Sequence, residues 1–334
     1  MSIFKTQEIG SLKKPSWLLE FLRSSASEEE KKAALDDASF VNLKMLEHIG
    51  LDFVYDGEAR RVEMYELPAK FIHGFEFVGR VRSWDNKYYK KARVIDEVSF
   101  VKNYHLEEFI FVKEHASKTP KIPVTGAYTL MDWSYNEYYD SREELALDLA
   151  KNIINRILKE LEGVGMQVVQ IDEPAATTHP SEMNMFAEVF NEQVKGINAK
   201  INTHICYSGD EYASLMPVIP DLKAKHFALE FANRDLNNIG VDDVSRPGYR
   251  ALKAFKEYAS DREIGLGVLD VHSDFIEPPE LIRDRILYAV KILGDPSKVY
   301  VNPDCGLRTR KREIAFAKLK NMIKGVKLAE AALR

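Results

Sequence analysis

Residues 141–171 read SREELALDLAKNIINRILKELEGVGMQVVQI, and the rest of the fold can be predicted from this pattern. Leucine and isoleucine side chains between Ser141 and Gly163 fall on one face when 3.6 residues make a turn, which predicts a helix. Gln167–Ile171 is a short apolar run typical of a buried strand. A helix followed directly by a buried strand is the repeating unit of α/β folds with parallel sheets.

The same alternation extends along the chain. Apolar, often β-branched runs predict eight strands, at Ile3–Ile9, Leu51–Tyr55, Ile122–Thr125, Gln167–Ile171, Lys200–Ile205, His226–Phe231, Glu263–Leu269 and Lys298–Val301. Helical periodicity lies between most of them, as in Pro279–Leu293. Strands joined by helical crossovers pair in parallel, and eight such units close a (β/α)8 barrel. We predict a single TIM barrel, with a doubly wound open sheet as the alternative.

Two segments depart from this repeat. Residues 67–120 mix aromatic and charged residues, as in FIHGFEFVGRVRSWDNKYYKKARVIDEVSF, and alternate like strands rather than like a helix. We interpret 67–120 as an insertion after the second strand that forms a hairpin and a short helix beside the mouth of the barrel. Residues 312–334 predict a charged amphipathic helix that closes the last unit. The sequence thus indicates one domain, residues 1–334, with that insertion inside it.

Composition and charge exclude several classes of protein. With 45% hydrophobic and 30% charged residues, the chain can bury a large core, which excludes global disorder. The net charge of −5 is spread along the chain rather than gathered in a basic stripe, so we expect no nucleic-acid partner. Residues 1–14 have no apolar leader pattern and no run of 18 apolar residues occurs, so we expect a cytoplasmic protein without membrane association.

Two cysteines, Cys206 and Cys305, point to a possible site. In a reducing compartment disulfides are rare, and such residues are either inert buried thiols or serve metals or catalysis. Cys206 lies two residues after His204 at the end of the fifth predicted strand, so the two side chains point the same way. Glu230 ends the sixth strand and Cys305 follows the eighth. In a barrel these ends meet on one face, where one nitrogen, two sulfurs and one oxygen suit tetrahedral zinc.

These four residues are also compatible with other arrangements. His204 and Cys206 alone fit a buried histidine beside a small apolar thiol, and Glu230 alone fits an ion pair with Arg234. A structural zinc site is a further alternative. Structural sites usually take ligands from short C-x2-C knuckles rather than from three separate strands, which favours a catalytic site at the mouth of the barrel.

Seven motifs carry a resemblance to a known family. They are IGS at Ile9–Ser11, DGE at Asp56–Glu58, DWS at Asp132–Ser134, QIDEPA at Gln170–Ala175, HICYS at His204–Ser208, DVHS at Asp270–Ser273 and NPDCGLRTR at Asn302–Arg310. Together and in this order they resemble the zinc-bearing, C-terminal catalytic barrel of the cobalamin-independent methionine synthases. The sequence resembles that barrel alone, as in short, single-barrel members of the family. The resemblance implies a methyltransferase that forms methionine by transferring a methyl group to the thiol of homocysteine.

The resemblance also implies a role for each matching residue. His204, Cys206, Glu230 and Cys305 match zinc ligands; Ile9, Gly10 and Ser11 match the turn that holds the homocysteine carboxylate; Glu58 and Asp172 match the pair that holds its ammonium group; Trp133 matches a platform for the methyl donor; His272 matches a proton relay near the reacting centre. Backbone N–H groups beside a glycine suit an anion, and two carboxylates suit an ammonium group.

The sequence departs from the family pattern at the donor site. Asp132 stands where folate-dependent members commonly have an Asn, and residues 67–120 match no family motif. The resemblance therefore leaves two donors open, a methylated folate and methylcobalamin, the latter free or on a corrinoid protein. Alternative functions are a zinc-dependent alkyltransferase for another small thiol, a uroporphyrinogen-decarboxylase-like barrel enzyme and a zinc-stabilised scaffold. Glu58 and Asp172 favour a thiol that carries an amino group.

Overall fold

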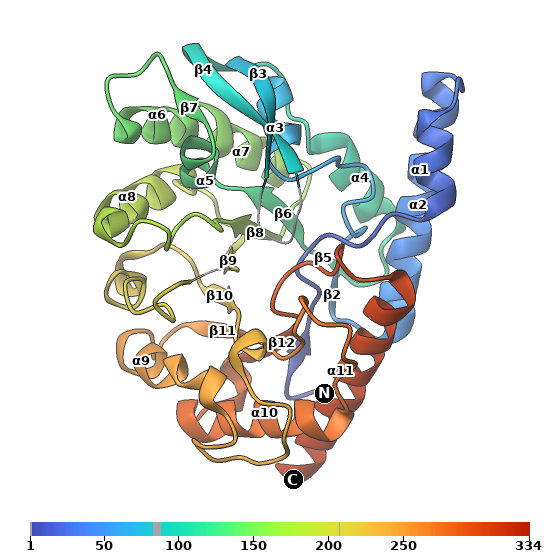
Figure 1. The fold of residues 1–334 in the computed structure, drawn as a ribbon, viewed down its shortest axis with the longest axis vertical. Helices are drawn as coiled ribbons and strands as arrows, with labels where there is room; N and C mark the ends of the chain where they lie inside the picture. Colours follow the sequence, from blue (N-terminus) through green and yellow to red (C-terminus); the bar gives the residue numbers. More distant parts are fainter. Residues whose placement is uncertain (1, 83–87, 207) are drawn as a thin grey trace. The chain divides into compact units, whose positions relative to one another are not determined.

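The computed structural model describes residues 2–82, 88–206 and 208–334 (Figure 1). The chain divides into two compact units. Unit 1 contains Met1–Arg60, Phe111–Lys121 and His226–Arg334, and unit 2 contains Arg61–Ile110 and Ile122–Lys225. In both units short buried strands alternate with helices, as the sequence pattern predicts.

Unit 1 holds the two ends of the chain. The label η marks a short 3-10 helix or, for η2, a π-helix. Its elements are β1 (Lys5–Thr6), α1 (Ser16–Arg23), α2 (Glu28–Ile49), β2 (Phe53–Val54), β5 (Thr119–Pro120), β10 (His226–Leu229), η5 (Ala232–Arg234), η6 (Pro247–Tyr249), α9 (Ala251–Tyr258), β11 (Glu263–Gly267), α10 (Pro279–Leu293), η7 (Pro296–Lys298), β12 (Val299–Asn302) and α11 (Arg312–Ala332). Strands β10, β11, β12 and β1 pair in parallel in that order, and β2 pairs in parallel with β5. The carboxyl ends of β10, β11 and β12 therefore meet at one edge.

Unit 2 repeats this plan over the middle of the chain. Its elements are α3 (Glu66–Phe71), β3 (Ile72–Arg82), β4 (Tyr88–Phe100), β6 (Ile122–Thr125), α5 (Ala127–Asp132), β7 (Tyr135–Asn136), α6 (Arg142–Asp148), η2 (Leu149–Ile154), α7 (Asn155–Gly163), β8 (Val168–Asp172), η3 (Pro180–Glu182), α8 (Met183–Gln193), β9 (Lys200–Ile205) and η4 (Met216–Asp221). Helix α4 (Leu106–His115) has residues in both units. Strands β6, β8 and β9 pair in parallel, and every residue of β6 and β8 is buried.

All eight predicted strand segments contain a strand. The first two are shorter than predicted. Strand β1 pairs with β12 at Tyr300 and Val301, and β2 pairs with β5 at Thr119 and Pro120 and forms a single bridge from Phe53 to Gln7. The sequence pattern missed β5, whose two residues directly precede the predicted strand Ile122–Thr125.

The helices also follow the prediction closely. Residues 142–163 are helical throughout as α6, η2 and α7, and Ser141 precedes them as the N-cap. The middle part, η2, is a π-helix, a widening that periodicity alone does not reveal. The Ser141 hydroxyl accepts a hydrogen bond from the backbone N–H of Glu144 (3.0 Å) and so caps the start of α6. Helix α10 matches its predicted bounds, and α11 ends at Ala332.

The segment 67–120 contains the predicted hairpin and a helix. Strands β3 and β4 are antiparallel and form the long ribbon labelled in Figure 1, and α4 follows them. Two register shifts interrupt the ladder, between His73 and Phe75 and between Phe77 and Gly79. Residues 83–87 of the predicted insertion lie outside the described residues. The position of the hairpin beside a barrel mouth stays a prediction.

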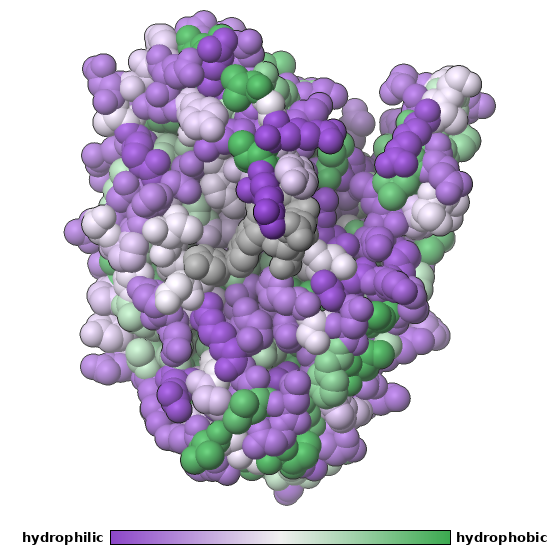
Figure 2. All heavy atoms as spheres, viewed as in Figure 1, coloured by the Kyte–Doolittle hydropathy of each residue, from purple (hydrophilic) through white to green (hydrophobic). Residues whose placement is uncertain are grey.

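The visible surface is mainly hydrophilic, and its hydrophobic side chains form small separate groups (Figure 2). Among the described residues, no helix has both the length and the apolar character needed to span a bilayer.

Candidate metal and substrate site

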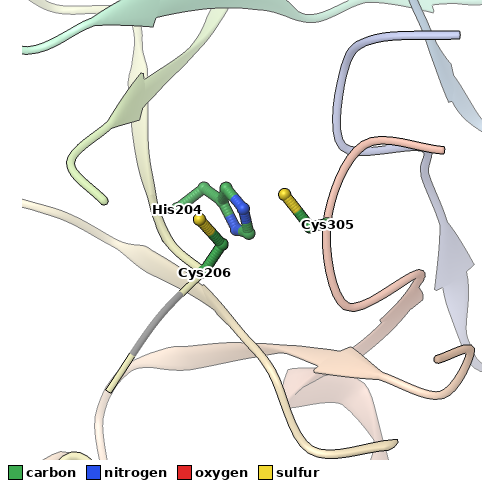
Figure 3. A group of neighbouring side chains, drawn as sticks. All are labelled: His204, Cys206 and Cys305. Atoms are coloured by element: carbon green, nitrogen blue, oxygen red, sulfur yellow. The ribbon is translucent and has the colours of Figure 1, made fainter. Parts of the chain in front are cut away.

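Three of the four predicted metal ligands form one group. One possible ligand atom from each of His204, Cys206 and Cys305 lies within 4.8 Å of the others. His204 belongs to β9, Cys206 directly follows it, and Cys305 follows β12. Figure 3 shows the imidazole ring and the two sulfur atoms gathered in one place. One nitrogen and two sulfur donors, two of them from buried residues, suit zinc better than they suit a hard cation.

The fourth predicted ligand, Glu230, directly follows β10 and is 1% exposed. Its carboxylate accepts a hydrogen bond from the Asn233 side chain (2.9 Å), and the Arg234 guanidinium lies 4.0 Å away, so the alternative ion pair exists as a long contact. Burial and the negative charges of Cys305 and Asp304 raise the pKa of Glu230 well above its ordinary value. A divalent cation would relieve such crowding of negative charge, so the residues present fit a metal.

Asp172 lies beside His204. The last residue of β8, Asp172, is the register partner of His204 in the parallel ladder with β9. Asp172 is buried, and its carboxylate accepts a hydrogen bond from the Gln170 side chain (2.7 Å). The structure thus brings a predicted substrate-binding carboxylate next to a predicted metal ligand.

The Asp56–Glu58 turn fixes the other predicted ammonium-binding residue. Gly57 and Glu58 both have positive φ values, 65° and 56°. Such a backbone is uncommon for a glutamate, and it is held because Asp56 accepts hydrogen bonds from the Glu58 backbone N–H (2.8 Å) and the Ser39 hydroxyl (2.7 Å). A side chain at Gly57 would also meet Leu12 at 2.9 Å. Gly57 thus allows the close contact with Leu12, and the hydrogen bond to Asp56 holds the backbone of Glu58.

The predicted carboxylate-binding segment packs against this turn. The backbone N–H of Leu12, directly after Ile9–Ser11, donates to the carbonyl of Gly57 (2.9 Å). Gly306, the residue after Cys305, has no Cβ, and a Cβ there would lie 2.5 Å from the Ser11 hydroxyl. Within unit 1, the segment 9–12 thus contacts both the turn that carries Glu58 and the residue after Cys305, although the three segments are far apart in the sequence.

Trp133 lies in a cluster of three aromatic side chains. Its ring centroid is 5.4 Å from that of Tyr89 and 6.2 Å from that of Tyr65. Tyr89 comes from the hairpin strand β4, and Tyr65 precedes α3. The Tyr65 hydroxyl is hydrogen-bonded to the hydroxyl of Ser134 (2.8 Å), and burial raises the pKa of Tyr65 to about 12. The hairpin thus contributes to the surroundings of the predicted donor platform.

The Asp132 carboxylate is bound by two neighbouring side chains, Arg142 and His179. It accepts hydrogen bonds from Arg142 (2.7 Å) and from His179 (2.8 Å), and Arg142 also contacts Glu182. These contacts outweigh the burial of Arg142 and raise the pKa of its guanidinium. An Asn at 132 would bring no charge to this network, which gives the departure from the family pattern a structural reason.

His272 lies in the segment after β11 and has an exposed side chain. Its backbone N–H donates to the Asp270 carboxylate (2.8 Å). Among the described residues, the group of possible metal ligands does not include His272. Its predicted role as a proton relay stays a prediction. Tyr207 of the HICYS motif lies outside the described residues.

Sequence reasoning missed two buried carboxylates beside the site. Glu173 follows Asp172, and its carboxylate accepts hydrogen bonds from the Thr129 backbone N–H (2.8 Å), the Thr129 hydroxyl (2.6 Å) and the Gln193 side chain (3.1 Å). Asp304 precedes Cys305 and accepts hydrogen bonds from three backbone N–H groups. Burial raises the pKa of Glu173 to about 7 and that of Asp304 to about 6. The only sequence signal was their position inside the QIDEPA and NPDCGLRTR motifs.

Comparison with known proteins gives independent evidence for the family of this chain. Residues 4–328 match the family described as "Cobalamin-independent synthase, Catalytic domain". The chain is 46% identical to "Methionine synthase" of Thermoplasma volcanium over 97% of both chains, and 45% identical to that of Thermoplasma acidophilum over the same shares.

A solved structure is also similar over the full length. The B12-independent methionine synthase from Shewanella sp. W3-18-1, in complex with selenomethionine, is 25% identical, with a TM-score of 0.85 over 100% of this chain and 99% of that one. The matched motifs, the His204, Cys206 and Cys305 group and these likenesses lead to one conclusion. The chain is a methyltransferase of the methionine synthase type and belongs to the cobalamin-independent methionine synthase family.

Proposed function

We propose that this protein is a zinc enzyme that transfers a methyl group to the thiol of homocysteine and forms methionine. The observation that carries this proposal is the grouping of His204, Cys206 and Cys305 within 4.8 Å. The names of the relatives support homocysteine as the acceptor, and the residues of this chain support zinc.

The proposed ligands are His204, Cys206, Glu230 and Cys305. Four ligands from three separate strand ends match a catalytic rather than a knuckle-type site. When bound, zinc lowers the pKa of a thiol that it coordinates, so that the nucleophilic thiolate is available at neutral pH. Two cysteinates and a glutamate bring about three negative charges against the two of zinc, which favours an electron-rich sulfur.

The remaining site residues would hold homocysteine by its two charged ends. Glu58 and Asp172 would bind the ammonium group, and both side chains are more than nine-tenths buried, which strengthens an ionic contact. The backbone N–H groups of Ile9, Gly10 and Ser11 would bind the carboxylate. This arrangement favours homocysteine over a small thiol without an amino group.

Trp133 would pack against the methyl donor, and its contacts with the Tyr65 and Tyr89 rings would hold it in place. The donor is a methylated folate or methylcobalamin, free or on a corrinoid protein. His272 would relay a proton near the reacting centre. Holding the thiol sulfur and the methyl carbon in contact can supply about 7 to 11 kcal/mol of the barrier.

For the fold, we propose that the eight strands close into one (β/α)8 barrel and that residues 1–334 act as one catalytic domain. The bridge between Gln7 and Phe53 joins the end of β1 to β2, and the parallel pair β2–β5 joins β2 to the segment directly before β6. Both pairings support a continuous sheet at these short strands. Residues 67–120 would cap the mouth of that barrel, since Tyr89 of the hairpin contacts Trp133.

Metal analysis of matched histidine variants tests the zinc proposal. We expect about one zinc per chain in the wild type and a large loss of zinc in His204→Gln, because a ligand is removed. His226→Gln is the control, since His226 is also fully buried but contacts Gln7 and lies outside the metal group. A full metal complement in Cys206→Ser/Cys305→Ser would overturn the zinc assignment.

Methyl-transfer assays on the same wild-type protein test the reaction. They use homocysteine with methylcobalamin and with methylated folate in parallel. We expect methionine from at least one donor and little activity with 3-mercaptopropionate, which lacks the amino group that Glu58 and Asp172 would bind. Equal use of the two thiols would count against the proposed pocket and for an alkyltransferase with another thiol substrate.

A further inference from the structure

The Asp304 carboxylate is hydrogen-bonded to the backbone of another segment of the same unit. Asp304 is fully buried, and its carboxylate accepts hydrogen bonds from the backbone N–H groups of Phe231 (2.9 Å), Ala232 (3.0 Å) and Asn233 (2.7 Å). Three successive N–H groups form a concave anion-binding turn, and here a carboxylate of the same chain occupies it. Asp304 therefore fixes the start of η5 to the end of β12.

The fixed turn begins directly after Glu230. Asn233, whose backbone N–H bonds to Asp304, also donates through its side chain to the Glu230 carboxylate (2.9 Å). A displacement of the turn would move both the backbone next to Glu230 and the amide that orients its carboxylate. The same Asp304 is the direct neighbour of Cys305 in the chain, so one side chain links the two predicted ligands.

The surroundings leave room for this carboxylate and for little else. A Cβ on Gly267, the last residue of β11, would collide with the Asp304 carboxylate. The Asp304 backbone N–H donates to the carbonyl of Leu269 (3.0 Å), which fixes Asp304 to the segment after β11 as well. Asp304 is thus held by β11 while it holds the turn after β10.

The buried turn also has an anchor at its far end. Asp235 contacts Arg246 (2.8 Å) and Arg285 (3.1 Å), and all three side chains are fully buried. With Asp235 fixed at one end and Asp304 at the other, residues 231–235 have little freedom. A turn restrained in this way can hold Glu230 in one position before a metal arrives, which reduces the conformational entropy lost on binding.

We propose that Asp304 is a positioning residue of the metal site, which sets Glu230 and Cys305 relative to each other by holding the turn 231–233. This inference rests on the proposed zinc function and goes beyond it, because Asp304 is not itself a ligand in the proposal. Partners of metal ligands commonly change metal affinity about 10- to 100-fold when they are removed.

The test is the zinc affinity of Asp304→Asn, measured by competition with a chromophoric chelator. An amide of the same shape keeps one acceptor but turns an NH2 group toward the N–H groups that Asp304 now accepts from. We expect zinc to bind at the same stoichiometry but about 10- to 100-fold more weakly. With Co²⁺ in place of zinc, we expect the visible absorption of the thiolate-bound ion to change in shape, because the position of Glu230 changes.

Asp284→Asn is the matched control. Asp284 is 2% exposed, lies in the same unit and also holds a backbone N–H, that of Gly240 (2.8 Å), but it is remote in sequence from the predicted ligands. A merely structural role would make both variants less stable and leave zinc affinity equal. Wild-type zinc affinity and an unchanged cobalt spectrum in folded Asp304→Asn would overturn this inference alone. Failure of the wild type to bind zinc would instead overturn the proposed function and this inference with it.

Discussion

The ends of β8 and β12 each carry two adjacent residues with different tasks. At the end of β8, Asp172 lies beside His204 while Glu173 reaches the start of α5. At the end of β12, Cys305 joins the metal group while Asp304 reaches the turn after β10. In each pair, one residue thus lies with the proposed metal ligands while its neighbour in the chain holds the surrounding structure.

The two holding carboxylates differ in their partners. The hydrogen bonds described for Asp304 come from backbone N–H groups, whereas Glu173 also accepts from the side chains of Thr129 and Gln193. Gln193 in turn accepts a hydrogen bond from the Ala127 backbone N–H (2.9 Å). The network of Glu173 therefore holds the helix that leads to Trp133, and it can be altered one side chain at a time. Asp304 holds the turn beside Glu230 and can be tested only by changing Asp304 itself.

Glu173→Gln should lower the free energy of unfolding more than the other variants described below. The amide presents an NH2 group to donors that now face a carboxylate, so we expect the free energy of unfolding to fall by about 3 kcal/mol. We also expect a raised KM for the methyl donor, because α5 leads to Trp133, with the zinc content unchanged. Urea denaturation, steady-state kinetics and metal analysis measure these three quantities.

Glu162→Gln is the control for Glu173→Gln. Its carboxylate accepts hydrogen bonds from the backbone N–H groups of Asn198 and Ala199 (both 2.7 Å) in the same unit, and it lies on α7 rather than at the end of β8. We expect this control to lose stability without a change in the donor KM. Loss of zinc in Glu173→Gln would contradict the division of tasks between Glu173 and Asp304.

A third buried carboxylate sharpens the comparison, because its partners are charged. Glu108 contacts Arg61 (2.5 Å) and His105 (2.6 Å), and all three side chains are at most 4% exposed. Burial alone would raise the pKa of Glu108, but Arg61 and His105 outweigh it and lower the pKa to about 2. Burial and the charge of Arg61 lower the pKa of His105 to about 4. Neutral donors leave the pKa of Glu173 and Asp304 raised, whereas a cation lowers that of Glu108.

These pKa values predict a loss of stability in acid. His105 is neutral in the folded protein down to about pH 4, whereas the unfolded chain binds its proton near pH 6.5, so stability falls as the pH drops between these values. Glu108 adds a loss as the pH drops from 4.5 toward 2. We expect wild type to lose on the order of 2 kcal/mol more than His105→Gln between pH 7 and pH 4.5. Equal slopes of unfolding free energy against pH would contradict this.

The sequence predicted the alternation of strands and helices because buried strands and amphipathic helices have different hydrophobic periods. It also placed His204, Cys206 and Cys305 in one group, since residues at the ends of parallel strands meet at one edge. It could not identify Glu173 or Asp304 as holding residues, because their partners lie on segments whose contacts depend on the tertiary fold. The contact of Trp133 with Tyr89 could not be predicted for the same reason, since the local sequence pattern does not determine the register of β4.

The smallest expected effect comes from Thr129→Val, which removes one hydroxyl from the Glu173 network and keeps the shape of the side chain. The hydroxyl bond to Glu173 (2.6 Å) is lost, but the Thr129 backbone N–H and Gln193 still donate to the carboxylate. One neutral donor to a buried carboxylate is worth about 1 kcal/mol, so we expect a fall of that size in the free energy of unfolding. Because α5 keeps its backbone bond to Glu173, the donor KM should stay near that of the wild type. A rise in KM as large as in Glu173→Gln would show that the hydroxyl, rather than the backbone bond, positions the helix before Trp133.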